Sequence, residues 1–315
     1  MSRTDRRYRP AYLQGETLLI VLTACVAVAA IVFSLIFEKP VNWLAFAVPT
    51  LGLAVVLLLG GYLRQIRGKE RWALFLNGSA IYLLFGMYAA ILTFTFLPVT
   101  ATSIDPVLID VDAAYGFSWG SSVELVAQVP LVGKVLQIVH SAVLWQLPMV
   151  IGILAILRRE ADLHRFVMAG TMALLLTLGV WVFAPSFGPA AYANISDDIA
   201  AAINLSADSA QTQRLMDLAA NGASVISPEA LMGAIAFPSY FMVILCLSVY
   251  FLRKTIAFWP AVALNSIMVP AVVIHGGHHL IDIAAGVAVF GVTMLITRRV
   301  VDPTRSSPAF RHRPV

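Results

Sequence analysis

Three histidines and an aspartate occur together between His275 and Asp282, in the order His-Gly-Gly-His-His-Leu-Ile-Asp. His278 and Asp282 are four residues apart, so on a helix they lie on one face, about one turn from each other. A carboxylate beside an imidazole fixes the ring's tautomer and stabilises its protonated form, which prepares the ring as a nucleophile or as an acid and base. The spacing therefore predicts His278 and Asp282 as a catalytic pair, with His275 and His279 as accessory candidates.

Two further segments contain residue types that suit a phosphate group. Pro238 and Ser239 precede an apolar run, as at a helix start, where backbone N–H groups and a serine hydroxyl can hold an anion. Gly188 and Pro189 follow another apolar run, and Gly277 lies inside the histidine segment. We predict these five residues as the phosphate-binding part of the site.

The elements that position these segments are predicted to be transmembrane helices. Of the 315 residues, 60% are hydrophobic and 12% are charged, which is typical of a polytopic membrane protein and excludes an ordinary soluble domain. A spanning helix needs about 20 apolar residues. Runs of about this length predict an all-α bundle of about eight transmembrane helices, at 17–37, 42–63, 73–97, 133–157, 166–184, 237–252, 256–274 and 278–297.

The basic residues indicate the orientation of the chain. Of the 21 Lys and Arg residues, all but Lys39, Lys134 and Arg214 lie on one side of the predicted spans. An excess of basic residues marks the cytoplasmic side, so we expect a multi-pass protein of the cell (inner) membrane with both termini in the cytoplasm. The basic charge is thus a signal of topology and gives no indication of nucleic-acid binding.

With this orientation the two long loops, 98–132 and 185–236, are external. The first alternates apolar and acidic residues, which predicts short interfacial helices, and the second contains an amphipathic segment at 212–220. The polar segments lie on the same side, so the site is expected on the external (periplasmic) face. The chain is divided into N-terminal membrane-anchoring helices (1–97), a membrane domain that contains the site (98–300) and a disordered cytoplasmic tail (301–315).

These segments resemble the type 2 phosphatidic acid phosphatase superfamily, and within it the branch of fungal inositol phosphorylceramide synthase and its bacterial relatives. Gly277-His278-His279-Leu280-Ile281-Asp282 is similar to the third motif of the family, and Phe237-Pro238-Ser239 to the start of the second. Pro185 with Gly188-Pro189 is similar to the proline-rich first motif of this branch. The segment from Ile104 to Trp119 is similar to the loop that precedes its catalytic core, and the resemblance covers residues 98–297.

The resemblance implies a six-helix phosphatase-like core after extra N-terminal helices, and an enzyme that acts on a membrane lipid phosphate or phospholipid. His278 would attack the phosphorus, oriented by Asp282, to form a phosphohistidine that is released to water or to an alcohol acceptor. Ser239 and backbone amides would hold the phosphoryl oxygens. No cofactor and no metal are implied, and no His, Cys, Asp or Glu cluster in the sequence has the spacing of a metal site.

One position departs from the family pattern. The second motif carries a histidine two residues after its serine, which donates a proton to the leaving group, whereas this chain has Phe241. His275, His279 or Tyr240 are candidates to supply that proton from a neighbouring position. His140 either faces the pocket or makes an interhelical hydrogen bond.

Phe241 supports an alternative function, that of a catalytically degenerate relative that binds lipid without turnover. A third interpretation is a transporter with an intramembrane His/Asp proton site, which predicts ionisable residues near the midplane and internal repeats. The polar residues instead gather at one face. A membrane lipid phosphatase or headgroup phosphotransferase is therefore the leading hypothesis.

Overall fold

Helices make up most of the described part of the chain. The computed structural model describes residues 10–99, 101–207, 209–228 and 236–300, and in these ranges the chain forms helices and no strand. The predicted all-α membrane bundle is confirmed, while the predicted tail at 301–315 lies outside the described residues. Six of the described helices are long and apolar enough to cross a membrane. They are α1 (Gln14–Ile36), α2 (Trp43–Gln65), α3 (Glu70–Thr95), α8 (Glu160–Phe183), α12 (Phe258–Gly276) and α13 (Leu280–Val300).

Two predicted spans do not form full-length helices. The run at 133–157 is divided between α6 (Pro130–Ser141) and α7 (Gln146–Ile156), and α6 meets the preceding α5 (Trp119–Ala127) at 118°. α11 (Tyr240–Leu252) has 13 residues, or about 20 Å at 1.5 Å per residue, against a hydrocarbon core of about 30 Å. A long apolar run predicts that the segment is shielded from water, but it does not predict that the segment is one uninterrupted helix.

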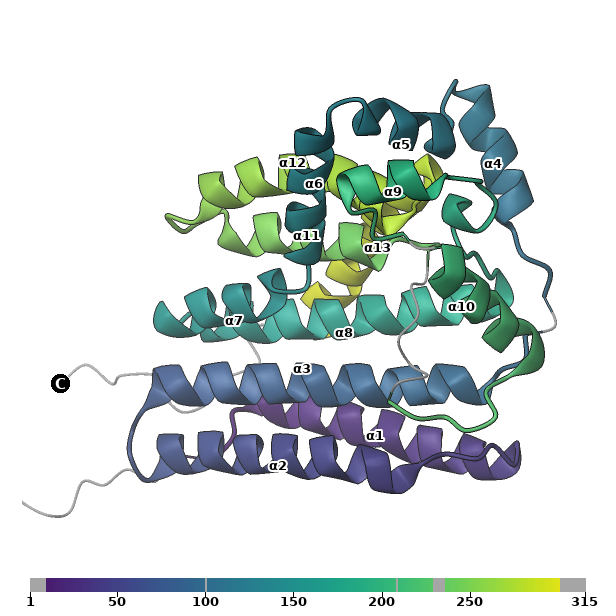
Figure 1. Cartoon of the computed structure of the whole chain (residues 1–315). Helices are drawn as coiled ribbons and strands as arrows, with labels where there is room; N and C mark the ends of the chain where they lie inside the picture. Colours follow the sequence, from purple (N-terminus) through teal and green to yellow (C-terminus); the bar gives the residue numbers. More distant parts are fainter. Residues whose placement is uncertain (1–9, 100, 208, 229–235, 301–315) are drawn as a thin grey trace, which may run out of the picture.

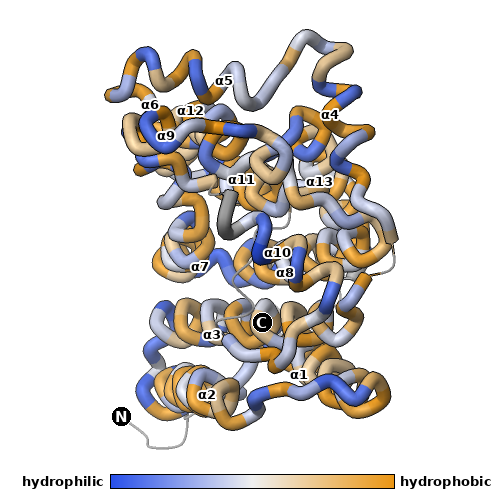
Figure 2. Tube along the Cα trace, turned by 45° about the vertical axis from the view of Figure 1, so that its right-hand side comes forward, coloured by the Kyte–Doolittle hydropathy of each residue, from blue (hydrophilic) through white to orange (hydrophobic). Residues whose placement is uncertain are grey.

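The helices pack in layers (Figure 1). α3 lies between α1 and α2 on one side and α7 and α8 on the other, and α8 in turn packs against α11 and α13. α12 packs against α11 and also against α6. The long helices are mostly hydrophobic, and hydrophilic residues gather in the connections and on α10 (Ser209–Asn221), as Figure 2 shows. The helices next to the histidine segment are thus supported from one side by α8 and the N-terminal layers.

Glycines let the helices approach closely. A β-carbon on Gly60 of α2 would lie 1.9 Å from Oδ1 of Asn77 on α3, and one on Gly286 of α13 would lie 2.5 Å from the backbone oxygen of Ser239. Lipid tails are as apolar as leucine, so membrane helices associate largely through such close packing. Gly286 therefore brings the first turns of α13 against the start of α11.

A buried group of charged residues ties the first three helices together. Arg64 of α2 forms an ion pair with Glu16 of α1 and another, at 2.8 Å, with Glu70 of α3. Asn77 of α3 also donates a hydrogen bond of 3.2 Å to Glu16. The side chain of Arg64 is buried, and its charge is offset by these partners. α1 is therefore an integral part of the bundle.

Short helices surround the connection between α12 and α13. α4 contacts α13, α5 contacts α12, α9 contacts α5 and α6, and α10 contacts the 3-10 turn η1. The predicted short helices in the 98–132 loop and the predicted helix near 212–220 are thus confirmed as helices. The elements not yet delimited are α4 (Asp105–Ala114), η1 (Pro189–Ala191) and α9 (Asp197–Ile203).

Candidate active site

The histidine segment forms the turn between α12 and α13. Gly277 follows the last residue of α12 with φ +62°, and α13 begins at Leu280. Glycine adopts this left-handed conformation most readily, which explains why it stands directly before His278. The side chains of His278 and His279 are both buried, so the turn directs them into the protein.

His278 and Asp282 form the pair that their spacing predicts. Nδ1 of His278 lies 3.2 Å from Oδ2 of Asp282, and the same oxygen accepts a hydrogen bond of 2.8 Å from the backbone N–H of His279. His278 is 2% exposed and Asp282 is 0% exposed. An ionised carboxylate accepts a proton-bearing Nδ1, and this tautomer leaves a lone pair on Nε2. Nε2 of His278 is therefore the atom available for nucleophilic attack.

Ser239 lies beside that nitrogen. Its Oγ is 3.4 Å from Nε2 of His278 and, as the N-cap of α11, accepts a 3.3 Å hydrogen bond from the backbone N–H of Met242. The backbone N–H of Ser239 donates to the backbone oxygen of Asp282 at 3.1 Å. Pro238 is buried directly before the cap. The N-terminus of α11, which offers free N–H groups and partial positive charge, is therefore adjacent to the histidine pair.

The segment after α8 joins the other two. Gly188 has φ +83°, and a β-carbon there would lie 2.1 Å from the backbone oxygen of Gly277. Pro189 then begins η1. The backbone N–H of Ala236 donates to the carbonyl of Ser186 at 3.4 Å, which ties the residues before α11 to those after α8. The three segments that the sequence placed on one side of the membrane thus meet in space.

His279 lies in a separate, acidic environment. Its Nδ1 is 2.7 Å from Oδ2 of Asp112, and its Nε2 is 3.4 Å from Oδ1 of Asp105. Burial disfavours the charged ring, but the carboxylates of Asp105, Asp282 and Asp112 outweigh it and raise the pKa of His279. With carboxylates at both nitrogens, the ring is suited to remain an imidazolium that holds α4 against the turn, and not to shuttle protons.

Asp105 connects this histidine to the segment after α8. Its carboxylate accepts hydrogen bonds from Oγ of Ser186 at 2.6 Å and from the backbone N–H groups of Phe187 at 2.8 Å and Gly188 at 3.2 Å. Burial works toward a higher pKa of Asp105, but His279 and these donors outweigh it, and the pKa is lowered. The sequence alone assigned no role to the two acidic residues that contact His279. Their seven-residue spacing, about two helical turns, is the signal that they share a face of α4.

The comparison with known families agrees with this geometry. A sequence profile of the PAP2 superfamily matches residues 106–296, more than half of the chain. The chain belongs to the PAP2 superfamily. The match includes all three segments of the site and all of α11 and α12. No curated protein and no solved structure shows a significant match.

Two accessory candidates for this PAP2 protein are engaged elsewhere. The hydroxyl of Tyr240 donates to the carbonyl of Gly170 at 3.0 Å and also hydrogen-bonds to Tyr82, so it is directed toward α3 and α8. Nε2 of His275 is 2.9 Å from the carbonyl oxygen of Gly133, which links α12 to α6. This structure therefore uses both side chains to join helices.

Phe241 lies between two imidazoles. Its ring meets that of His278 edge to face at a centroid distance of 6.0 Å and that of His140 at 5.6 Å. Position 241, where the PAP2 motif is expected to have a histidine, thus presents an apolar wall to the site. Among the described residues, Nε2 of His140 is buried and has no hydrogen-bond partner. The alternative expected for His140, an interhelical hydrogen bond, is not formed at that atom.

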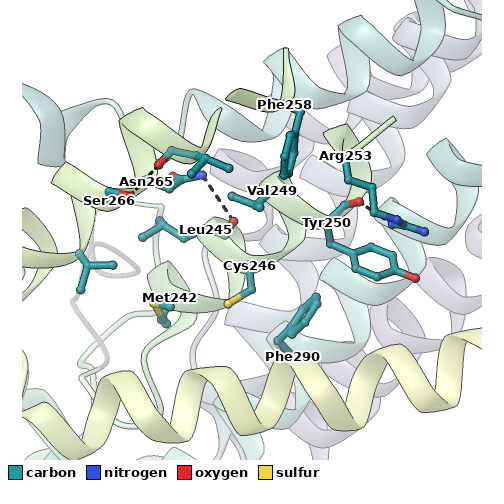
Figure 3. A pocket seen from close by; sticks show the side chains of 12 residues that line it. Met242, Leu245, Cys246, Val249, Tyr250, Arg253, Phe258, Asn265, Ser266 and Phe290 are labelled. Atoms are coloured by element: carbon teal, nitrogen blue, oxygen red, sulfur yellow. Dashed lines mark hydrogen bonds between the residues drawn. The ribbon is translucent and has the colours of Figure 1, made fainter. Parts of the chain in front are cut away.

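An apolar groove runs along α11 away from the site (Figure 3). Its volume is about 550 Å³, and it is bounded by α11, by α12 and by Phe290 of α13. Met242 lines it close to Ser239, and Arg253 lines it beyond the last residue of α11. Asn265 of α12 donates a hydrogen bond of 3.5 Å to the carbonyl of Leu245 (Figure 3). The groove therefore extends from the neighbourhood of the histidine pair to the other end of α11.

A second, more polar cavity lies against His279. Its volume is about 410 Å³, and its lining includes Asp112, Trp119 and Pro189. In the described ranges, no group of three or more His, Cys, Asp or Glu side chains is arranged to hold a metal ion.

Proposed function

We propose that this PAP2 protein is an integral membrane lipid phosphatase or lipid-headgroup phosphotransferase that acts at the external face through a phosphohistidine on His278. The observation that carries the proposal is the placement of Nε2 of His278. Asp282 holds the opposite ring nitrogen at 3.2 Å, and Nε2 is directed to Ser239 at the start of α11. The external location is supported by the distribution of Lys and Arg along the chain.

In the first step Nε2 of His278 attacks the phosphorus of a lipid phosphate, and the bond between phosphorus and the lipid oxygen breaks. Asp282 stabilises the positive ring that results. Ser239 and the free N–H groups of α11 stabilise the phosphoryl oxygens as their charge develops. In the second step water or an alcohol attacks the phosphohistidine, gives up a proton and leaves His278 as a neutral ring. Water yields phosphate, and an alcohol yields a new phosphodiester or phosphomonoester.

The groove along α11 suits an acyl chain of the substrate. Its wall is largely apolar, and it begins at Met242, whose backbone N–H is bound to Ser239. A lipid with its phosphate at the histidine pair can therefore place a chain between α11 and α12. The similarity of Ile104–Trp119 and of the proline-rich segment to the inositol phosphorylceramide synthase branch supports headgroup transfer to an alcohol acceptor.

The proposal is tested by turnover of the purified protein in detergent. Phosphate release and headgroup exchange are measured with a panel of lipid phosphates and phospholipids, together with an acid-labile phosphoprotein. His278→Ala is expected to abolish turnover and phosphoprotein, and Asp282→Asn to lower the rate by about 10² to 10⁴. Cys25→Ala, an exposed position on α1, serves as the control. Full activity of His278→Ala would rule out the mechanism.

The second candidate function is lipid binding without turnover, and the apolar ring at position 241 favours it. This alternative predicts that the wild-type protein binds a lipid phosphate, for example in a fluorescence assay, but releases no phosphate and forms no phosphoprotein. The two functions are therefore separated by the same panel of substrates.

A further inference from the structure

Protonation of the leaving oxygen has no assigned residue, because Phe241 cannot donate a proton. Resting on the proposed function, we propose that His140 of α6 is the general acid of this site, in place of the histidine expected at position 241. The acid would then have moved from α11 to a neighbouring helix that packs against α12.

The other histidines around His278 have a polar or charged neighbour at both ring nitrogens. Nε2 of His275 lies against the carbonyl of Gly133, and its Nδ1 accepts from the backbone N–H of Ser206. Nδ1 of His279 is hydrogen-bonded to Asp112, and its Nε2, which makes no hydrogen bond among the described residues, lies 3.4 Å from the carboxylate of Asp105. Nε2 of His140 is buried and, in the described part of the chain, makes no hydrogen bond. An unpaired buried polar atom is costly. A substrate oxygen placed beside it removes that cost.

The position of Nε2 of His140 fits the role of an acid. A β-carbon built on Gly276 would lie 3.3 Å from Nε2 of His140 and 3.4 Å from Nε2 of His278. Both nitrogens therefore lie within 3.4 Å of one point. The space between the two nitrogens has to hold the phosphorus atom, which His278 attacks, and the leaving oxygen, which His140 protonates. Gly276 has no side chain to fill the space.

The neighbouring rings hold His140 in place. Phe241 contacts the His140 and His278 rings edge to face, and so forms one wall shared by the two imidazoles. On another side, the His275 ring stacks on His140 at a centroid distance of 6.3 Å and an interplanar angle of 29°. His275 is itself fixed to α6 through Gly133. Two aromatic contacts and one hydrogen bond thus orient a ring whose own Nε2 is free.

The proton balance closes with His140 alone. Burial favours the neutral ring in the empty site, and the negative charge of a bound phosphate favours the protonated ring. A lipid phosphate that binds with one proton on its phosphate group supplies that proton to Nε2 of His140. His140 gives the proton to the departing lipid oxygen, which leaves as an alcohol while Nε2 of His278 gains the phosphorus. Neutral His140 then accepts a proton from the water or alcohol that attacks the phosphohistidine. The departing phosphate product takes this proton with it, and both rings are again neutral.

The test uses two substrates that differ in how much their leaving groups need a proton. A phosphatidic acid in detergent micelles has an alkoxide leaving group, and 4-nitrophenyl phosphate has one that is stable without protonation. In a single turnover, which reports the first step alone, His140→Gln is expected to slow release of the lipid alcohol by about 10² to 10⁴ and release of 4-nitrophenol by less than about tenfold. Retained release of 4-nitrophenol also shows that the variant is folded. His164→Gln is the matched control, because His164 of α8 is likewise buried with Nε2 unpaired among the described residues, but contacts Gly15 of α1.

The double variant His140→Gln/Phe241→His has a histidine on α11 again. It is expected to turn over the lipid at least tenfold faster than His140→Gln does. Phe241→His alone is expected to change lipid turnover by less than about threefold, since the wild-type site already has its acid. First-turnover release of the lipid alcohol by His140→Gln within threefold of wild type, or an equal loss of first-turnover release with both substrates, overturns the role of His140. If turnover depends on His278 but not on His140, the inference alone fails. If wild type turns over neither substrate, or if His278→Ala stays active, the proposed function fails and His140 has no leaving group to protonate.

Discussion

At the scale of single residues, the contact between Gly188 and Gly277 fixes how closely the segment after α8 approaches the histidine turn. Gly188 combines φ +83° with a backbone oxygen 2.1 Å from the place where a β-carbon would stand. No other residue type meets both conditions, so this approach depends on glycine at that position.

Gly188→Ala is therefore expected to lower both stability and turnover. A non-glycine residue at positive φ costs about 1 to 3 kcal/mol, and the clash with the backbone oxygen adds to it. The measurements are the thermal unfolding midpoint in detergent and phosphate release. Gly179→Ala on α8 is the matched control, because a β-carbon there meets nothing within 4 Å, and it should be neutral or slightly stabilising. Equal behaviour of the two variants would contradict the close approach.

The charges at His279 and Asp105 make stability depend on pH. The pKa of His279 in the folded protein is raised from its ordinary value of 6.5. The stabilisation that the protonated ring gives to the fold is therefore complete below pH 6.5, and it is lost as the pH rises through the raised pKa. The pKa of Asp105 in the folded protein is lowered from its ordinary value of 3.8. The stabilisation that its carboxylate gives to the fold is therefore complete above pH 3.8, and it is lost as the pH falls through the lowered pKa.

Stability in detergent is thus expected to be highest between about pH 4 and pH 6.5 and to fall on the alkaline side. His279→Gln should unfold at a lower temperature in this window and should lose the alkaline decline. Thermal unfolding from pH 5 to pH 9 measures both. A decline of the same size in His279→Gln would assign it to other groups.

At the scale of elements, α11 combines a catalytic end with a groove wall. Its first turn contains the cap that faces His278, and its later turns present Leu245, Cys246 and Val249 to the groove. One helix therefore relates the position of the phosphate to the path of the acyl chain.

Cys246→Trp is expected to fill part of the groove and to raise KM for a long-chain lipid phosphate by about tenfold, the scale of 1.4 kcal/mol, with kcat nearly unchanged. A short-chain, water-soluble lipid phosphate should be affected by less than threefold. Cys25→Trp, on the exposed face of α1, is the control. An equal effect on both chain lengths would show that the groove holds no chain.

At the scale of the whole molecule, the basic residues predict which ends of the helices face the cytoplasm. Single cysteines at Glu124 and Asp198, in an otherwise cysteine-free chain, should react with an impermeant thiol reagent in intact cells, and one at Arg67 should not. All three side chains are exposed. Asp112 lies in a loop that the same prediction places outside, but it is a poor reporter, since its carboxylate contacts His279. Reversed labelling would move the site to the cytoplasmic face.

Much of this architecture could be predicted because its signals are local. Apolar length predicts α1, α2 and α3, and helical spacing predicts that His278 and Asp282 meet. The rest depends on contacts between distant residues. No local pattern distinguishes the broken run at 133–157 from an intact span, and the pairing of His279 with Asp112 joins residues 167 positions apart. The directions of the His275 and Tyr240 side chains follow from the packing of the helices. The sequence could therefore name both residues as candidates, but it could not show that they hydrogen-bond to the carbonyls of Gly133 and Gly170.

The length of α13 sets the depth of the reaction in the proposed orientation. α13 begins two residues after His278, and its 21 residues cover about 32 Å, close to the hydrocarbon core of about 30 Å. With Arg298 and Arg299 at the cytoplasmic end, as the proposal has it, the histidine turn lies near the outer boundary of the membrane. For an enzyme of the proposed kind, water at this boundary competes with the hydroxyl groups of neighbouring lipids for the phosphohistidine. The ratio of free phosphate to exchanged headgroup among its products would therefore measure how well this boundary is hydrated.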